Sequence, residues 1–268
     1  MKFLYLIAKQ HVDESVVCYL TEVVEKMKAG LHILVVSKDK GKEKTALKEL
    51  EALNLPLSEE NFTISAQVGD PVDAMLAALE ANTYDMVMMG VHRRRRVIPS
   101  QFRFMSQRII KNCPIPIMLI RRVSKKLDRI LVCTGGKEIS EPVVELSTRL
   151  AGTADLKATL LNVAAAVPSM YTGIGAMEER LEKLLETDTP LAQHLRRSAE
   201  MLSRHDITAE IKLKHGDVVE EILEEVHSGD YDLVVLGEPS EQIVTRMLLG
   251  NVTQQIINRA ASAVLIVK

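Results

Sequence analysis

Short apolar runs alternate along the chain with longer amphipathic stretches. The segments 13–30 and 70–82 lie between such runs and carry apolar residues at the spacing of a helix. Strands that are apolar on both faces and alternate with helices require a parallel sheet covered on both sides, so the pattern predicts an α/β fold. The predicted strands are FLYLIA, LHILVV, FTISAQV, DMVMMG and IPIMLI, followed by RILVCT, KATLLNV, AEIKLKH, DLVVLG and AVLIV.

The elements occur in the same order twice because the sequence contains an internal repeat. A shift of 147 residues places VGDPVDAMLAALEANTYDMVMMG (68–90) on HGDVVEEILEEVHSGDYDLVVLG (215–237) without a gap. The early parts of the copies match only when the shift is about 20 residues shorter, so the second copy carries an insertion. We expect two doubly wound domains in tandem, each with a five-stranded parallel sheet, at residues 1–123 and 128–268. The polar segment 121–129 is expected to link them.

The composition is that of a globular protein and argues against several kinds of partner. The 268 residues are 47% hydrophobic and 26% charged, with a formal net charge of -2. Such a chain has no overall attraction for nucleic acid or anionic membranes, and 3% aromatic residues leave few rings for base stacking. No apolar stretch approaches the roughly 20 residues that span a bilayer. We therefore expect a cytoplasmic protein with no nucleic-acid partner and no membrane partner.

Two segments of the second copy follow strands at which the winding of such a sheet reverses, where ligands of open parallel sheets bind. They are CTGGKEIS (133–140) and GEPSEQIVTRMLLGNVTQQII (237–257). Gly250 permits close approach of the backbone, and Asn251 or Thr253 can cap a helix whose N-terminus attracts phosphate. These residues favour a phosphate site, although an ordinary loop before a helix would look the same.

The end of the second copy resembles a known family more specifically. GEPSEQIVTRMLLGNVTQQIINRAASAVLIVK is similar to the end of universal stress protein domains, which carry G-x2-G-x9-G-[S/T], a helix and a last strand. Each of the two copies resembles one such domain, so the resemblance covers nearly the whole chain. It implies two Rossmann-like, adenine nucleotide alpha hydrolase-like domains. It also implies a stress-response regulator that binds ATP or another adenine nucleotide, with Mg²⁺ as a candidate ion.

Carried over by position, the resemblance implies a nucleotide site in the second copy. Its glycines and helix start would hold the phosphates and ribose, its strand ends would line the adenine pocket, and the loop after the first strand would add backbone N–H groups. The residues concerned are Thr134, Gly135, Gly136, Val163, Leu236, Gly237, Ser240, Gly250, Asn251, Val252 and Thr253.

Three of these positions depart from the family pattern. Ser240 stands in place of a glycine, Asn251 in place of Ser or Thr, and Gly135 where the family usually has an aspartate. Asn251 can still donate a hydrogen bond and cap the helix. The exposed N–H groups of the Gly-Gly turn could serve an anion or the adenine edge in place of the aspartate.

The first copy departs further, and we expect it not to bind ATP in the family's manner. Gly90 is kept, but Arg93 and Arg103 replace the other two glycines and Phe104 replaces the Ser or Thr. Bulky side chains obstruct a cradle made of backbone N–H groups. The run Arg93, Arg94, Arg95 and Arg96 then forms either an anion site or a patch that faces an acidic partner; we favour the patch.

The sequence leaves alternatives to an adenine-nucleotide sensor that turns over no ATP or hydrolyses it slowly. An interaction module with both nucleotide sites degenerate is one of them. An ATP-pyrophosphatase-type enzyme is another, suggested by TGGKE, but Ile139 stands where that loop needs a serine. No Ser/His/Asp or Cys/His arrangement is legible in the sequence.

Several polar residues have simpler structural interpretations. Asp70 and Asp217 each precede a predicted helix and are expected to be N-caps rather than catalytic carboxylates. The pairs 84–85 and 231–232, both Tyr-Asp, are expected to be structural. Ser169 to Gly175, in the insertion, is a candidate lid or a plain surface loop. We expect the two copies to pack as an internal pseudo-dimer through their last strands and the chain to form a homodimer.

Overall fold

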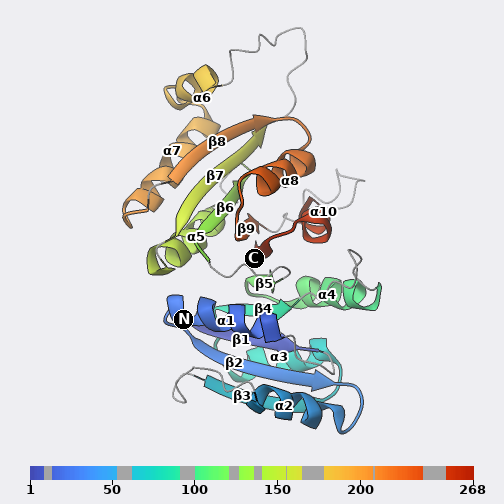
Figure 1. The fold of residues 1–268 in the computed structure, drawn as a ribbon. Helices are drawn as coiled ribbons and strands as arrows, with labels where there is room; N and C mark the ends of the chain where they lie inside the picture. The colour runs from blue at the N-terminus through green and yellow to red at the C-terminus, as the bar shows by residue number, and fades with distance from the viewer. Residues whose placement is uncertain are drawn as a thin grey trace. The chain divides into compact units, whose positions relative to one another are not determined.

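The computed structural model describes residues 1–8, 14–52, 62–90, 100–120, 127–135, 141–154, 156–164, 178–207, 209–237 and 252–268. The chain divides into two compact units, Met1–Lys126 and Leu127–Lys268. Figure 1 shows that each unit consists of a twisted sheet with helices packed against it. The predicted α/β class is therefore confirmed for both halves of the chain.

The first unit has five parallel strands in the order β3-β2-β1-β4-β5. Helices connect successive strands because a parallel pair cannot be joined by a tight turn. The elements are β1 (Lys2–Ile7), α1 (Glu14–Lys26), β2 (Gly30–Ser37), α2 (Lys42–Ala52), β3 (Phe62–Val68), α3 (Pro71–Ala81), β4 (Met86–Gly90), α4 (Ser100–Asn112) and β5 (Ile117–Ile120).

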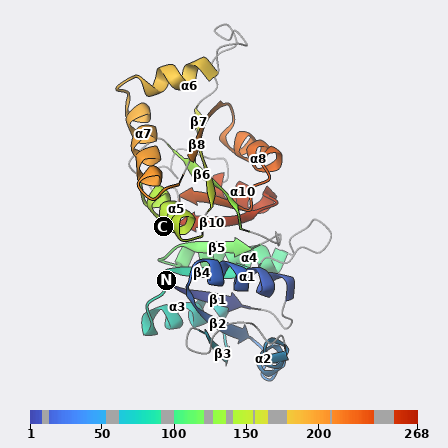
Figure 2. The same cartoon turned by 60° about the vertical axis from the view of Figure 1, so that its left-hand side comes forward.

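The second unit repeats this topology with the strand order β8-β7-β6-β9-β10, again all parallel. In Figures 1 and 2, α5 and α7 lie on one face of this sheet, and α8 and α10 lie on the other. Its elements are β6 (Arg129–Thr134), α5 (Glu141–Ala154), β7 (Lys157–Ala164), α6 (Glu178–Leu185), α7 (Pro190–Ser203), β8 (Ala209–His215), α8 (Val218–Ser228), β9 (Leu233–Gly237), α10 (Val252–Arg259) and β10 (Ala263–Val267).

The strands are buried on both faces, as their uninterrupted apolar runs predict. All five residues of β10 are buried, and so are all four residues of β5. No helix in the described ranges is long and apolar enough to cross a membrane.

In both units, an aspartate accepts hydrogen bonds from the backbone at the start of the first strand. In the first unit, the backbone N–H of Lys2 donates to Asp85 Oδ2 at 2.7 Å. In the second unit, Asp232 Oδ2 accepts the backbone N–H groups of Asp128 and Arg129 at 2.9 and 3.0 Å. Each aspartate therefore joins the first strand of its sheet to the turn before the fourth strand.

The tyrosine before each of these aspartates makes a structural contact in both units, as the sequence predicts. Tyr84 and Tyr231 are 6% and 4% exposed. The Lys2 ammonium lies 5.1 Å from the centre of the Tyr84 ring, and the Arg129 guanidinium lies 5.1 Å from that of Tyr231. A cation over an aromatic face is attracted by the negative ring face, so each unit uses the same contact at the same place.

The two predicted N-caps are also confirmed. Asp70 accepts the backbone N–H of Val72 at the start of α3, and Asp217 accepts those of Val219 and Glu220 at the start of α8. Asp70 additionally accepts two hydrogen bonds from the Arg108 guanidinium, at 3.0 and 3.3 Å. Its carboxylate therefore caps one helix and joins it to α4.

Replacing Asp232 with alanine should destabilise the second unit by about 1–2 kcal/mol, because two backbone N–H groups lose their acceptor. Urea unfolding at pH 7 measures this loss. Asp232→Asn keeps one acceptor oxygen and should lose less stability than Asp232→Ala. Equal losses for the two variants would show that the oxygen is not what holds the strand start.

Candidate functional site

The candidate site lies at the carboxyl ends of the strands in the second unit, where the winding direction changes. From β6 the chain proceeds to β7 and β8 on one side, and it returns to β9 and β10 on the other. The register pairs Thr134 with Asn162 and Val267 with Gly237, so the ends of β6, β7, β9 and β10 come to one edge of the sheet. This edge is where a doubly wound sheet offers its crevice to a ligand.

Thr134, the last residue of β6, has a buried hydroxyl at this edge. The residue is 6% exposed, and its Oγ1 has no hydrogen-bond partner among the described residues. A buried hydroxyl without a partner is unfavourable by about 1–3 kcal/mol, so it marks a place where a further polar group belongs. The adjoining residues 136–140 lie outside the described ranges.

Asn162 is a site residue that the sequence analysis missed. It is 4% exposed, and its Nδ2 donates to the backbone carbonyl of Thr134 at 2.8 Å. This bond fixes the end of β6 against β7. The signal in the sequence was a single amide within the apolar run KATLLNVA, immediately before Val163, which is itself partly exposed at the strand end.

Gly237, the last residue of β9, is packed closely against a helix. A Cβ atom built there would lie 3.1 Å from Val143 Cγ2 of α5. In the first unit, a Cβ at Gly90 would lie 3.1 Å from Val16 Cγ1 of α1. The absence of a side chain thus lets a helix approach the strand end in both units, and this packing accounts for the repeated glycine without any ligand.

The remaining candidate residues divide between described and undescribed parts of the chain. Leu236 is buried within β9, Gly135 is exposed after β6, and Val252 and Thr253 are the first two residues of α10. Thr253 is 7% exposed. Gly136, Ser240, Gly250 and Asn251 lie outside the described residues, as do Arg93, Arg94, Arg95 and Arg96 and the segment 169–175.

In the first unit, the glycine at the end of β4 lies close to a buried tyrosine. A Cβ at Gly90 would lie 3.0 Å from the Tyr5 hydroxyl oxygen, and Tyr5 is 4% exposed. Phe104 is 66% exposed on α4. Tyr5 and Val16 are therefore the side chains nearest to Gly90, and the obstruction expected from Arg93 and Arg103 stays a prediction.

The described part of the edge shows neither a reactive thiol nor a cluster of metal ligands. Burial raises the pKa of the Cys133 thiol, beside Thr134, with a further contribution from the negative charge of Glu225. The thiol stays protonated at neutral pH and is a poor nucleophile. Within the described residues, no group of three or more His, Cys, Asp or Glu side chains could hold a metal ion.

The fold defines a class, that of tandem doubly wound α/β proteins whose winding reverses at the first strand of each sheet. The sequence model of the Universal stress protein family matches residues 3–121 and again residues 126–268. The chain therefore belongs to the universal stress protein family and carries two family domains in tandem.

Two solved structures that align with nearly the whole chain have the same fold. A universal stress protein from Archaeoglobus fulgidus is 16% identical over 99% of this chain and 98% of its own, with a TM-score of 0.71. One from Pseudomonas aeruginosa is 13% identical over 100% and 92%, also with a TM-score of 0.71. A universal stress protein in complex with cAMP is 20% identical over 53% of this chain and 97% of its own, with a TM-score of 0.43. No curated protein sequence matches the chain.

Proposed function

We propose that the second unit binds an adenine nucleotide at the carboxyl edge of its sheet and that the protein acts as a stress-response sensor or regulator. The observation that carries this proposal is the buried Thr134 hydroxyl at the winding reversal, which has no partner among the described residues. A ligand oxygen or nitrogen in the crevice would satisfy it. Membership of the universal stress protein family makes an adenine nucleotide our candidate ligand.

The proposed roles follow from the positions of the residues. Val163 and Leu236 at the strand ends form the apolar wall for the base, and the Thr134-Gly135-Gly136 turn offers a hydroxyl and backbone N–H groups. The start of α10 would hold the phosphates, because the free N–H groups and dipole of a helix N-terminus attract anions. The phosphate residues in this proposal are Gly237, Ser240, Gly250, Asn251, Val252 and Thr253, with Mg²⁺ as a candidate ion.

Calorimetric titration of the full chain with ATP and Mg²⁺ tests the proposal. Thr134→Val removes the hydroxyl at nearly constant volume, and we expect about fivefold weaker binding because one hydrogen bond contributes about 1 kcal/mol. Gly250→Arg should abolish binding by obstructing the helix start. Thr21→Val is the matched control: Thr21 is 5% exposed and donates to a carbonyl within α1 of the first unit.

Absence of binding heat with ATP, ADP, AMP and cAMP would contradict the proposal. Equal affinities for wild type and Thr134→Val would show that the hydroxyl is not part of the site. Release of AMP and pyrophosphate would instead support the pyrophosphatase-type enzyme; we expect no turnover or slow hydrolysis to ADP.

The packing of Gly237 favours a second candidate, an interaction module without a ligand. Gly237 lies against Val143 and Gly90 lies against Val16, so the close packing of a helix explains why both positions are glycine. A chain that uses them only for packing would show no thermal shift with any nucleotide, and mass spectrometry of the purified protein would find no bound small molecule. The cytoplasmic location, the internal pseudo-dimer, the homodimer and the arginine patch stay predictions.

A further inference from the structure

A serine, a histidine and a tyrosine form a row of hydrogen bonds in the first unit, away from the candidate nucleotide edge. Ser65 Oγ lies 2.7 Å from Nε2 of His32, and Nδ1 of the same ring lies 2.5 Å from the Tyr84 hydroxyl. The residues come from β3, β2 and the turn before β4, and His32 and Tyr84 also stack with ring centres 5.9 Å apart. Both imidazole nitrogens are therefore engaged, one by the serine and one by the tyrosine.

The fold itself does not require this row. The register pairs His32 with Thr63 in the first unit and Thr159 with Glu210 in the second, so Thr159 occupies the position of His32. Thr63 on β3 therefore corresponds to Glu210 on β8. Two residues further along these strands, Ser65 corresponds to Lys212. The second unit keeps the tyrosine and the cation over its ring but has no histidine or serine here.

The row is accessible from one side. Ser65 and His32 are both partly exposed, and Ser65 lies on β3, the outermost strand of its sheet, whereas Tyr84 is buried. In the second unit, Glu225 of α8 reaches this face and bonds to Lys212 and Tyr231. The repeat places Ala78 of α3 at the position of Glu225, and a methyl group covers less of the face than a carboxylate side chain.

The protonation states suit a base at His32. Burial, followed by the nearby positive charge of Lys2, lowers the pKa of His32, so its imidazole is neutral at neutral pH. Burial raises the pKa of Tyr84, so its phenol keeps its proton. The two hydrogen bonds allow either tautomer of the neutral ring. In the tautomer that donates Nδ1–H to the Tyr84 oxygen, Nε2 presents its lone pair to the Ser65 hydroxyl, and the proposal below takes this tautomer.

We propose that Ser65 is an activated nucleophile, with His32 as its general base and Tyr84 as the residue that orients the imidazole, and that it accepts the acyl group of small activated carboxylic esters. A nucleophile within hydrogen-bond reach of a base that a third group orients is the arrangement of nucleophilic catalysis. The proposal is independent of nucleotide binding, because it concerns the other unit and residues at the opposite part of the strands.

The reaction balances with water as the second reactant. As Ser65 Oγ forms a bond to the ester carbonyl carbon, its proton passes to His32 Nε2. The bond from that carbon to the leaving alcohol oxygen breaks, and the alcohol departs with the proton from Nε2. Water then attacks the acyl group, giving its proton to Nε2; the carboxylic acid leaves, and Ser65 Oγ regains the proton.

The test is labelling of the folded full-length protein with an alkyl fluorophosphonate, followed by peptide mass spectrometry to locate the adduct. We expect one phosphonylated residue, Ser65, with fluoride as the leaving group. Loss of the base in His32→Gln should slow the labelling at least about a hundredfold, and Tyr84→Phe should slow it about tenfold. Thr45→Ala, on α2, where the hydroxyl donates to the Gly41 carbonyl, is the control and should label at the wild-type rate.

The labelling rate distinguishes an activated serine from a structural one. Circular dichroism of each variant shows that it is folded, and wild type unfolded in urea gives the intrinsic rate of an ordinary serine. A Ser65 adduct that forms at least about a hundredfold faster in the folded protein supports the proposal. No adduct at Ser65, a rate equal to that of the unfolded chain, or equal rates for wild type and His32→Gln would overturn it.

Discussion

Replacing Gly229 with alanine should destabilise the second unit by about 2–3 kcal/mol, the cost of forcing an extra carbon into a packed core. Gly229 follows α8, and a Cβ built there would lie 2.1 Å from Cε2 of the Tyr231 ring. The backbone at Gly229 has φ -91° and ψ -3°, which any residue can adopt, so the expected loss comes from this contact and not from a glycine-only conformation.

The Tyr231 ring cannot move aside without losing other contacts. Its hydroxyl donates to Glu225 Oε1 at 2.9 Å, and the Arg129 guanidinium lies over the ring. Thermal and urea unfolding of Gly229→Ala measure the loss. In a Tyr231→Ala background, the same substitution should change stability by less than about 0.5 kcal/mol, the size of an ordinary surface change. A full loss in that background would show that the ring is not the cause.

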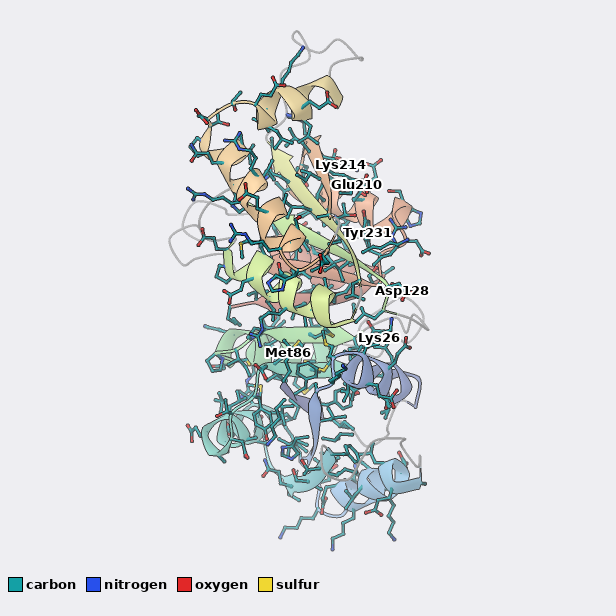
Figure 3. The ribbon with its side chains drawn as sticks, turned by 90° about the vertical axis from the view of Figure 1, so that its left-hand side faces the viewer. Lys26, Met86, Asp128, Glu210, Lys214 and Tyr231 are labelled. Atoms are coloured by element: carbon teal, nitrogen blue, oxygen red, sulfur yellow. The ribbon has the colours of Figure 1, made fainter. Side chains whose placement is uncertain are left out.

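Replacing Lys212 with methionine should also destabilise the second unit, by about 2–3 kcal/mol, because it leaves the buried Glu225 carboxylate without its main partner. The Lys212 ammonium lies 2.9 Å from Glu225 Oε1, and the side chains are 31% and 6% exposed. Lys214 and Tyr231 still contact the carboxylate, and Lys212 is partly hydrated, so the loss is smaller than for a fully buried pair. The side chains of Lys214 and Tyr231 can be found in this unit in Figure 3.

The double variant Lys212→Met with Glu225→Leu should recover most of the loss, since replacing both partners with apolar side chains removes the buried charge. A double-mutant cycle from urea unfolding gives the coupling between the two residues. A double variant less stable than Lys212→Met alone would contradict the interpretation of Glu225 as a buried charge that depends on Lys212.

The same pair predicts how stability depends on pH. Burial by itself raises the pKa of Glu225, but the hydrogen bonds from Lys212 and Tyr231 and the two lysine charges outweigh it, so the pKa is lowered. A lowered carboxyl pKa adds stability that is complete above the unfolded value of about 4.3 and is lost as the pH falls below it. Wild type should therefore lose more stability between pH 7 and pH 3 than the double variant does.

The elements of the fold could be predicted because each has a local signal. Uninterrupted apolar runs indicate strands covered on both faces, and Asp70 and Asp217 before amphipathic stretches indicate helix starts. The repeat added the tandem arrangement, since Tyr84 and Tyr231 fall on each other without a gap. These features depend on residues close together in the chain.

The contacts that depend on strand register could not be predicted. His32 is 33 residues from Ser65 and 52 from Tyr84, and nothing in their spacing indicates that they meet. Asn162 reaches Thr134 across 28 residues for the same reason. The resemblance placed the candidate nucleotide residues by position, but Tyr5 beside Gly90 depends on side-chain packing that no motif describes.

The contacts of the aspartates at the strand starts allow an estimate of the loop-closure entropy that the insertion adds in the second unit. The contact between Asp85 and Lys2 closes 83 residues of chain, whereas that between Asp232 and Arg129 closes 103. Loop-closure entropy grows with the logarithm of length, so the longer loop costs only about 0.2 kcal/mol more. In loop-closure entropy the insertion is therefore nearly neutral. Its effect falls on kinetics: with longer chain separations between contacting strands, the second unit should fold more slowly than the first.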